Sequence, residues 1–203
     1  MNRKGTLFIF SGPSGSGKDT VLQELLKINK NVRLSISTIT RDPRTNEIPG
    51  EKYNFTTKEK FVDMINNNEL LEYNMYLDNY YGTPKAPVDA WLNEGLDVIL
   101  EIDVNGAFKV KQQRPEAVMV FLLPASIEVL YHRVNKRGTE PQEIIDKRVN
   151  EAKREISLCD KYDYLVVNDV LEDAVSDFNA IIRAQALKNI NMTEIINEVK
   201  KDA

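Results

Sequence analysis

Residues 12–18 have the types and spacing of a phosphate-binding loop. They match the pattern G-x-x-x-x-G-K, in which glycines let backbone N–H groups turn toward phosphate oxygens. An apolar run, Leu7 to Phe10, predicts a strand before the loop, and apolar spacing predicts a helix after it. A helix start adds partial positive charge, and Lys18 can reach the outer phosphates. The context favours a nucleotide site over a glycine-rich turn, and its residues are Gly12, Pro13, Ser14, Gly15, Ser16, Gly17 and Lys18.

The residue after Lys18 is Asp19, where most loops of this pattern place Ser or Thr to hold Mg²⁺. A negative charge beside phosphates is unfavourable unless a cation intervenes. Asp19 either faces Mg²⁺ through water or points away as a first-turn acid that suits the helix dipole. We favour the second interpretation, in which phosphates and water hold the metal. Thr20 follows, and we expect both residues at the nucleotide site.

A second group of residues, between positions 35 and 83, has the types that bind an acceptor nucleotide. Arg41 and Arg44 lie in a proline-containing loop, and five of the eight tyrosines lie between Tyr53 and Tyr81. Arginines and tyrosine hydroxyls can bind a second, smaller phosphate by charge-assisted hydrogen bonds. Glu72 lies mid-strand, where a carboxylate can accept from the N–H donors of guanine, whereas adenine presents an acceptor. Each residue alone suits an ordinary surface or core role, but beside a phosphate loop they indicate a guanine nucleotide.

Several elements must position these residues. Apolar runs predict strands at 98–102, 118–123 and 165–167, and helical patterns occur near 84–93, 105–112, 126–136, 141–157 and 171–188. Short apolar strands that alternate with helices predict a parallel sheet between helical layers. Residues 35–83, called the inserted region below, depart from this rhythm and predict mixed strands.

Composition excludes several other classes. The chain has 203 residues, a net charge of −4 and 42% hydrophobic residues, which fits one globular domain or a core with small subdomains. Single copies of Cys159 and His132 exclude an internal disulfide, a Cys-rich zinc site and a His-cluster metal site. No secretory signal or membrane-length apolar stretch is present, so we expect a cytoplasmic protein. The acidic balance disfavours general nucleic-acid binding.

The charge is unevenly distributed. Residues 131–154 carry seven basic and four acidic side chains, hence +3 within a chain of net charge −4. Arg137, Gly138 and Thr139 with Pro141 separate two predicted helices, as expected of a hinged lid. Arginines from a closing lid can stabilise the charge that develops on a transferred phosphoryl group.

At this point the chain resembles the guanylate kinase family. The resemblance runs from residue 5 to about 187, and its residues are 12–18, Ser35 to Arg44, Glu47, Gly50, Tyr53, Phe55, Leu71 to Tyr73, Asn79 to Thr83, Glu101 to Gly106, Arg137 to Glu140, and Val167 to Asp169. It implies a P-loop NTPase three-layer α/β core with a parallel sheet, formed by 1–34, 84–125 and 160–203. It also implies a mixed-β GMP-binding region at 35–83, and a helical lid with flanking helices at 126–159.

The resemblance also implies site residues. Ser37, Arg41, Arg44, Tyr53 and Tyr81 would hold the phosphate of GMP, and Glu72, Thr83 and Asp103 would read the guanine. Arg133, Arg137 and Arg148 would act with Lys18 and Arg41 in catalysis, and Asn168 would join the ATP site. The family commonly has Asp where Glu101 stands; Glu101, and Asp19 in the interpretation that we do not favour, would reach Mg²⁺ only through water.

The reaction implied is ATP + GMP to ADP + GDP, with Mg²⁺ accompanying ATP and dGMP as a further acceptor. We expect no nucleic-acid or membrane partner, and a monomer or homodimer. Two alternatives are a non-catalytic phosphopeptide-binding module of the same family and a related kinase for another small molecule, such as a sugar phosphate. The intact Gly17-Lys18 pair disfavours the first, and Glu72 and Asp103 beside the tyrosines disfavour the second.

Overall fold

A five-stranded parallel sheet forms the centre of the computed structural model, which describes residues 3–45, 47–76, 78–135 and 141–201. The spatial order of its strands is β2 (Val32–Leu34), β7 (Asp97–Glu101), β1 (Leu7–Ser11), β8 (Val118–Pro124) and β9 (Tyr164–Asn168). Every pairing between neighbours is parallel. The segments that follow β1, β7 and β9 therefore leave the sheet at one edge, where open α/β sheets bind their ligands.

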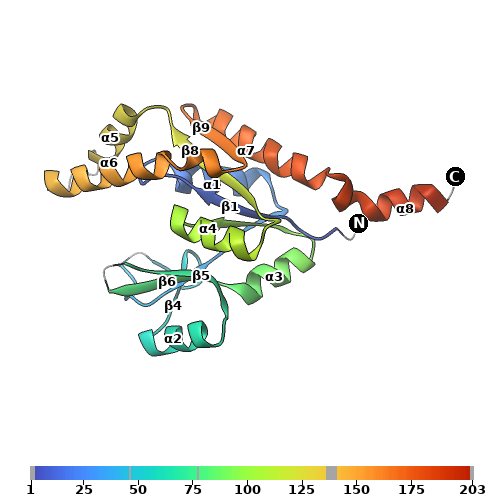
Figure 1. Ribbon diagram of the computed structural model, residues 1–203, viewed down its shortest axis with the longest axis horizontal. Coiled ribbons are helices and arrows are strands. Elements are labelled where there is room, and N and C mark those ends of the chain that lie inside the picture. Colours follow the sequence, from blue (N-terminus) through green and yellow to red (C-terminus); the bar gives the residue numbers. More distant parts are fainter. Residues whose placement is uncertain (1–2, 46, 77, 136–140, 202–203) are drawn as a thin grey trace.

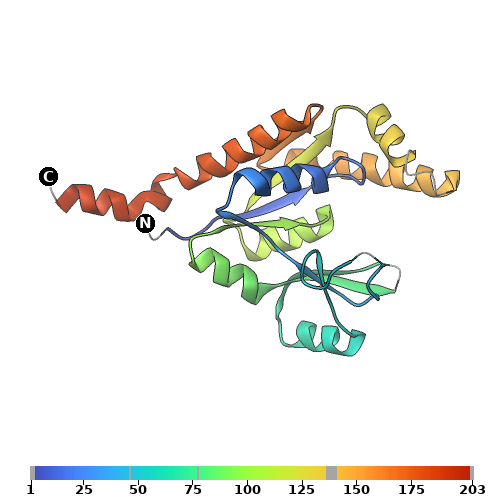
Figure 2. The same cartoon turned by 180° about the vertical axis from the view of Figure 1, so that it is seen from behind.

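Helices cover both faces of this sheet, as Figures 1 and 2 show from opposite sides. On one face lie α1 (Lys18–Ile28) and α7 (Leu171–Ala186), and on the other α3 (Lys85–Asn93) and α4 (Val104–Gln113). Strand β1 shows why both faces are covered: Phe8 and Phe10 pack with α1 and α7, while Leu7 and Ile9 pack with α3 and α4. Alternate side chains of a strand point to opposite faces, so an all-apolar strand needs two apolar layers.

The inserted region forms a separate mixed sheet with the order β4 (Tyr53–Phe55), β3 (Ser37–Ile39), β6 (Asn79–Pro84) and β5 (Leu70–Tyr76). Strands β3 and β4 are parallel, whereas β6 is antiparallel to both β3 and β5. Helix α2 (Lys58–Asn66) begins after Thr57, whose hydroxyl accepts from the backbone N–H of Lys60 at 3.3 Å. In Figure 1 this region lies below the parallel sheet, next to α4.

Two helices, α5 (Ile127–Asn135) and α6 (Gln142–Ile156), project over the carboxyl edge of the parallel sheet (Figure 1). They pack on each other through a small apolar cluster that includes Leu130, Val134 and Val149. A 3-10 turn, η1 (Cys159–Lys161), leads from α6 into β9. At the opposite end, η2 (Asn189–Met192) and α8 (Thr193–Lys201) extend the chain beyond α7, near the amino terminus.

The fold class predicted from the sequence is confirmed: a parallel sheet between helical layers carries a separate mixed sheet and further helices. The strands predicted at 98–102, 118–123 and 165–167 occur as β7, β8 and β9, with ends that differ by at most one residue. The lid hinge at 136–140, which contains Arg137, lies outside the described residues. No helix in the described ranges is long and apolar enough to cross a bilayer.

Candidate active site

The phosphate loop joins β1 to α1 at the centre of the carboxyl edge. Gly17 has a φ of 96°, a left-handed conformation that favours glycine, and a Cβ there would overlap the side-chain amide of Asn168. That amide is buried at the end of β9, and its Nδ2 donates to the carbonyl oxygen of Ser16 at 2.7 Å. Arg133 donates to the same oxygen at 3.3 Å. Asn168, assigned to ATP from the sequence, thus holds the loop backbone in place.

Lys18 is folded back over the loop, where its Nζ donates to the carbonyl oxygens of Gly12 at 2.6 Å and Pro13 at 3.3 Å. Burial lowers the pKa of Lys18, while the carboxylates of Glu101, Glu155 and Asp19 act against that shift. An ammonium whose hydrogen bonds to the described residues all go to loop carbonyls is well placed to bind an anion.

Two of the three arginines predicted from the lid contact the phosphate loop. Besides Arg133 on α5, Arg148 on α6 donates from Nη2 to the hydroxyl of Ser14 at 2.6 Å. The third, Arg137, lies outside the described residues. Two helices far along the chain therefore bring positive charge to the loop, although charge patterning alone could not show which residues they meet.

A cavity of about 550 Å³ opens at the loop, and we call it the phosphate-loop cavity. Its lining residues are Ser14, Gly15, Gly17, Lys18, Asp19, Thr20, Glu101, Arg133, Asn168, Asp169 and Leu171. Of the predicted ATP-binding residues, Gly12, Pro13 and Ser16 do not line it. Ser16 is fully buried, and its hydroxyl has no hydrogen-bond partner among the described residues.

A second cavity of about 300 Å³, the acceptor cavity, lies between the inserted region and the ends of β7 and α4. Its lining residues are Ser37, Tyr53, Glu72, Asn74, Tyr76, Tyr81, Gly82, Glu101, Ile102 and Asp103. Five of the eight residues predicted for GMP are among them. The other three, Arg41, Arg44 and Thr83, are not.

Glu72 is a buried carboxylate on β5. It is paired in register with Thr83 on β6, whose hydroxyl donates to Oε1 of Glu72 at 2.7 Å. Burial raises the pKa of Glu72 to about 7, and the hydrogen bond from Thr83 limits this rise. Thr83 therefore acts through Glu72, because its own side chain is buried away from the cavity.

Asp103 lies opposite Glu72, at the start of α4. Its Oδ1 caps the helix by accepting from the N–H of Gly106 at 2.7 Å, and its Oδ2 accepts from Asn74 at 3.2 Å. Gly106 lets the helix approach Glu72 closely, since a Cβ at that position would lie 3.0 Å from Oε2 of Glu72. Two carboxylates thus face one small cavity, which suits a ligand rich in N–H donors.

Arg41 is held by a carboxylate of its own loop. Its Nη1 and Nη2 donate to Glu47 at 2.6 and 2.7 Å, and its guanidinium lies 5.5 Å from the ring centre of Tyr53. The hydrogen bond from Arg41 lowers the pKa of Glu47 to about 2. Arg44 is exposed, and its backbone N–H also donates to Glu47. The sequence assigned both arginines to a phosphate but gave no sign of this pairing.

Glu101 lines both cavities, which therefore adjoin each other at the end of β7. Burial, followed by the charge of Asp19, raises the pKa of Glu101. A divalent cation would compensate these two carboxylates, and Mg²⁺ is commonly bound by one or two carboxylates together with substrate phosphates and water. Within the described ranges no three His, Cys, Asp or Glu side chains are grouped to hold a metal by themselves. Asp19 and Glu101 thus fit a metal that arrives with a nucleotide.

The structure adds residues that the sequence analysis did not assign. Asn74, Tyr76 and Ile102 line the acceptor cavity, and Asp169 and Leu171 line the phosphate-loop cavity. Glu155 on α6 affects Lys18 electrostatically, and burial raises its pKa to about 7. Tyr76 lies among the tyrosines noted from the sequence, and Asp169 is adjacent to Asn168. The amphipathic pattern of α6 gave no sign of Glu155.

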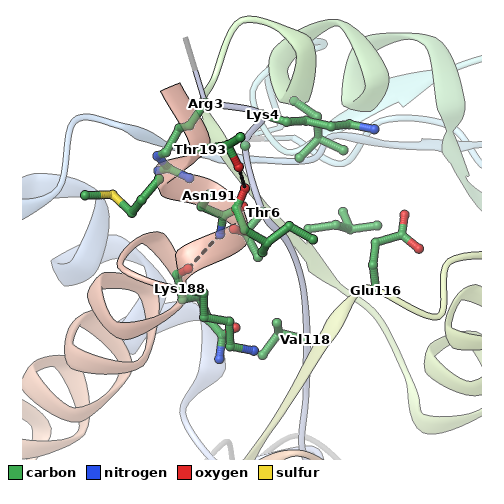
Figure 3. Close-up of a pocket in the computed structure, with 14 residues that line it drawn as sticks. Arg3, Lys4, Thr6, Glu116, Val118, Lys188, Asn191 and Thr193 are labelled. Atoms are coloured by element: carbon green, nitrogen blue, oxygen red, sulfur yellow. Dashed lines mark hydrogen bonds between the residues drawn. The ribbon is translucent and has the colours of Figure 1, made fainter. Parts of the chain in front are cut away.

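A third cavity, of about 540 Å³, lies at the opposite edge of the parallel sheet (Figure 3). Residues from the amino terminus, including Arg3 and Thr6, meet there with Lys188 and Asn191 from the segment after α7. None of the residues predicted for either nucleotide lines it. The chemistry-bearing side chains are thus gathered at the carboxyl edge.

Comparisons with known proteins agree with this geometry. The family model described as Guanylate kinase matches residues 4–185. Curated relatives named guanylate kinase include one from Carboxydothermus hydrogenoformans, 52% identical over 91% of this chain and 91% of its own length. Another, from Oceanobacillus iheyensis, is 44% identical over 100% of this chain and 98% of its own. The crystal structure of guanylate kinase from Anaplasma phagocytophilum covers 94% of this chain and 90% of its own, with a TM-score of 0.76 and 31% identity.

Proposed function

The chain belongs to the guanylate kinase family, and from this premise we propose how its residues transfer the γ-phosphoryl group of ATP to GMP. It is an ATP:GMP phosphotransferase, a nucleoside monophosphate kinase. The observation that carries the assignment of residues is that the two cavities adjoin each other and share Glu101. Substrates bound on either side would present their phosphates to each other.

ATP binds at the phosphate-loop cavity in this proposal. The loop N–H groups and the start of α1 hold the β- and γ-phosphates, and Lys18 leaves the carbonyls of Gly12 and Pro13 to bind them. Arg133 and Arg148 then exchange their bonds to the loop for bonds to the transferred group. Arg137 is assigned the same role from the sequence alone.

GMP binds at the acceptor cavity. The ionised carboxylates of Glu72 and Asp103 accept from the N–H donors of guanine, while Thr83 and Asn74 hold these carboxylates in place. Ser37, Tyr53 and Tyr81 contribute polar groups for the phosphate. Arg41 and Arg44 lie in the loop between β3 and β4, and Glu47 in this loop orients Arg41.

Proton transfer by a side chain is not required. The second pKa of a phosphate monoester is about 6, so the acceptor is largely ionised near neutral pH. His132, the single histidine, is exposed on α5 and 4.0 Å from Glu128. The residues therefore act by positioning two phosphates and neutralising their charge.

Enzymes of this family use ATP and generally need a divalent cation. We propose Mg²⁺, which would be held near Asp19 and Glu101 together with phosphate oxygens and water. When bound, it neutralises charge on the phosphates. The cytoplasmic location and the monomer or homodimer expected from the sequence remain predictions.

ADP release coupled to a reporter reaction tests the acceptor assignment. The purified chain is assayed with ATP and each of GMP, dGMP, AMP, UMP and dTMP. We expect turnover with GMP and dGMP and little with the others. A preference for AMP or dTMP would refute the roles of Glu72 and Asp103. The comparisons give no support to the phosphopeptide-binding or sugar-phosphate alternatives.

A further inference from the structure

An ion pair connects the first turn of α1, directly after the phosphate loop, to the inserted region. Nζ of Lys52 lies 2.7 Å from Oδ1 of Asp19, which is in the first turn of α1. Lys52 is carried by a turn that begins at Gly50, where φ is 87°. Within the ranges that the structure describes, no other hydrogen bond or ion pair joins residues 40–56 to residues 11–34.

This ion pair contributes little to folding stability. Both side chains are more than half exposed, and exposed pairs contribute about 0–1 kcal/mol. A second exposed pair in the same region, Lys58 with Asp78 at 2.8 Å, joins α2 to the β5–β6 turn and lines neither cavity. The two pairs are similar in chemistry and differ in location, so Lys58 provides a matched control.

Lys52 lies next to residues of both cavities, although it lines neither. Asp19 lines the phosphate-loop cavity beside Lys18, and its negative charge would repel the phosphates of a nucleotide. On the other side, Lys52 precedes Tyr53, which lines the acceptor cavity. The ammonium of Lys52 donates to the Asp19 carboxylate at 2.7 Å, so the two opposite charges compensate each other there.

We propose that Lys52 is a positioning residue for phosphoryl transfer, which acts through Asp19. Its ammonium neutralises the Asp19 carboxylate, so that nucleotide phosphates can approach α1. The same ion pair holds the turn that precedes Tyr53 against the first turn of α1, so that the two substrates face each other. This explains how an Asp can occupy the position after Lys18, where Ser or Thr is usual. The kinetic part of the inference rests on the proposed function, whereas the charge part concerns nucleotide binding alone.

Four proteins separate these two effects: the wild type, Lys52→Met, the double variant Lys52→Met with Asp19→Asn, and the control Lys58→Met. The affinity for ADP is measured by calorimetry in metal-free buffer without GMP. We expect Lys52→Met to weaken ADP binding about fivefold, because an unneutralised carboxylate then faces the phosphates. The double variant regains wild-type affinity because it lacks that charge, and Lys58→Met is unchanged.

Turnover at saturating ATP and GMP reports on whether the ion pair between Lys52 and Asp19 positions the two substrates. It should fall in Lys52→Met, which lacks the ion pair but keeps the Asp19 carboxylate at the metal site, and stay at the wild-type level in Lys58→Met. Thermal melts check that all four proteins fold. Wild-type ADP affinity in Lys52→Met, or equally weak binding in the double variant, would overturn the inference, as would wild-type turnover in Lys52→Met. If the wild type released no ADP with GMP, the proposed function would fail, while calorimetry would still decide the charge effect.

Discussion

The hydroxyl of Thr83 donates a 2.7 Å hydrogen bond to Oε1 of Glu72, directly across the β5–β6 strand pair. Both residues are buried, and no charged partner compensates Glu72 at hydrogen-bond distance among the described residues. The hydrogen bond stabilises the ionised carboxylate against burial, which raises its pKa to about 7. The N–H donors of guanine need ionised acceptor oxygens. Because Thr83 affects the pKa of Glu72, it sets the pH range in which GMP is recognised.

Thr83→Val should therefore shift the pH dependence of GMP use. The variant keeps the shape of the side chain but loses the donor, so the pKa of Glu72 rises further and the ascending limb of kcat/KM for GMP moves to higher pH. Thr83→Ser keeps the hydroxyl and is the matched control. The ionisation of the GMP phosphate is common to all three proteins, so it cancels when their pH profiles are compared. Superimposable profiles for Thr83→Val and the wild type would contradict this role.

Glu72→Gln should lose GMP recognition while gaining stability. Between pH 4.5 and about 7 the folded chain binds more protons at Glu72 than the unfolded chain does, so the free energy of unfolding falls as pH rises through this window. The loss reaches about 3 kcal/mol above pH 7, from 1.36 kcal/mol per pKa unit. The amide introduced by Glu72→Gln is neutral at every pH, and its oxygen can still accept from Thr83.

Urea unfolding of both proteins at pH 4 and pH 8 measures this effect. The stability advantage of Glu72→Gln should appear at pH 8 and largely disappear at pH 4. Glu155, whose pKa is also raised by burial, titrates in both proteins and cancels in the difference. An advantage that is equal at the two pH values would show that Glu72 is not responsible.

Gly106→Ala should weaken the use of GMP without lowering the stability of the fold. The added Cβ would lie 3.0 Å from Oε2 of Glu72, so that carboxylate must shift, whereas Oδ1 of Asp103 at 3.5 Å is in ordinary van der Waals contact. Replacing Gly with Ala in a helix stabilises it by about 1 kcal/mol. We expect a severalfold higher KM for GMP with an unchanged KM for ATP and no loss of thermal stability. An unchanged KM for GMP would argue against a close fit between α4 and the guanine.

The parts of the site that could be predicted are those encoded locally. The phosphate loop depends on seven consecutive residues, and Glu101 and Asp103 follow a strand whose apolar run is evident. Contacts between distant segments could not be predicted. Lys52 and Asp19 are 33 positions apart, and Arg148 reaches Ser14 across 134. Such pairs depend on how the inserted region and α6 pack on the core, which a single sequence does not specify. The pairing of Arg41 with Glu47 was missed although it is local, because loop carboxylates are common.

Asn168→Asp should disrupt the phosphate loop without changing the shape of the side chain. The Asp oxygen that replaces Nδ2 cannot donate, so it would face the carbonyl oxygen of Ser16 as a second acceptor. Losing a buried hydrogen bond in this way costs about 1–3 kcal/mol. We expect weaker ADP binding and a lower melting temperature. Asn150→Asp, at an exposed position on α6, controls for the added charge. Equal ADP affinities in the two variants would refute a positioning role for Asn168.

Lys18→Met should remove turnover and leave the fold intact. Burial lowers the pKa of Lys18, so we expect its charge to be unfavourable to the folded chain. Met keeps the apolar stem, so the free energy of unfolding should be unchanged or higher. Loss of a cation at the transferred phosphoryl group should lower kcat by about 10²–10³. Lys27→Met, in the exposed last turn of the same helix, is the control and should retain wild-type turnover. Turnover in Lys18→Met equal to that of Lys27→Met would refute the role assigned to the phosphate loop.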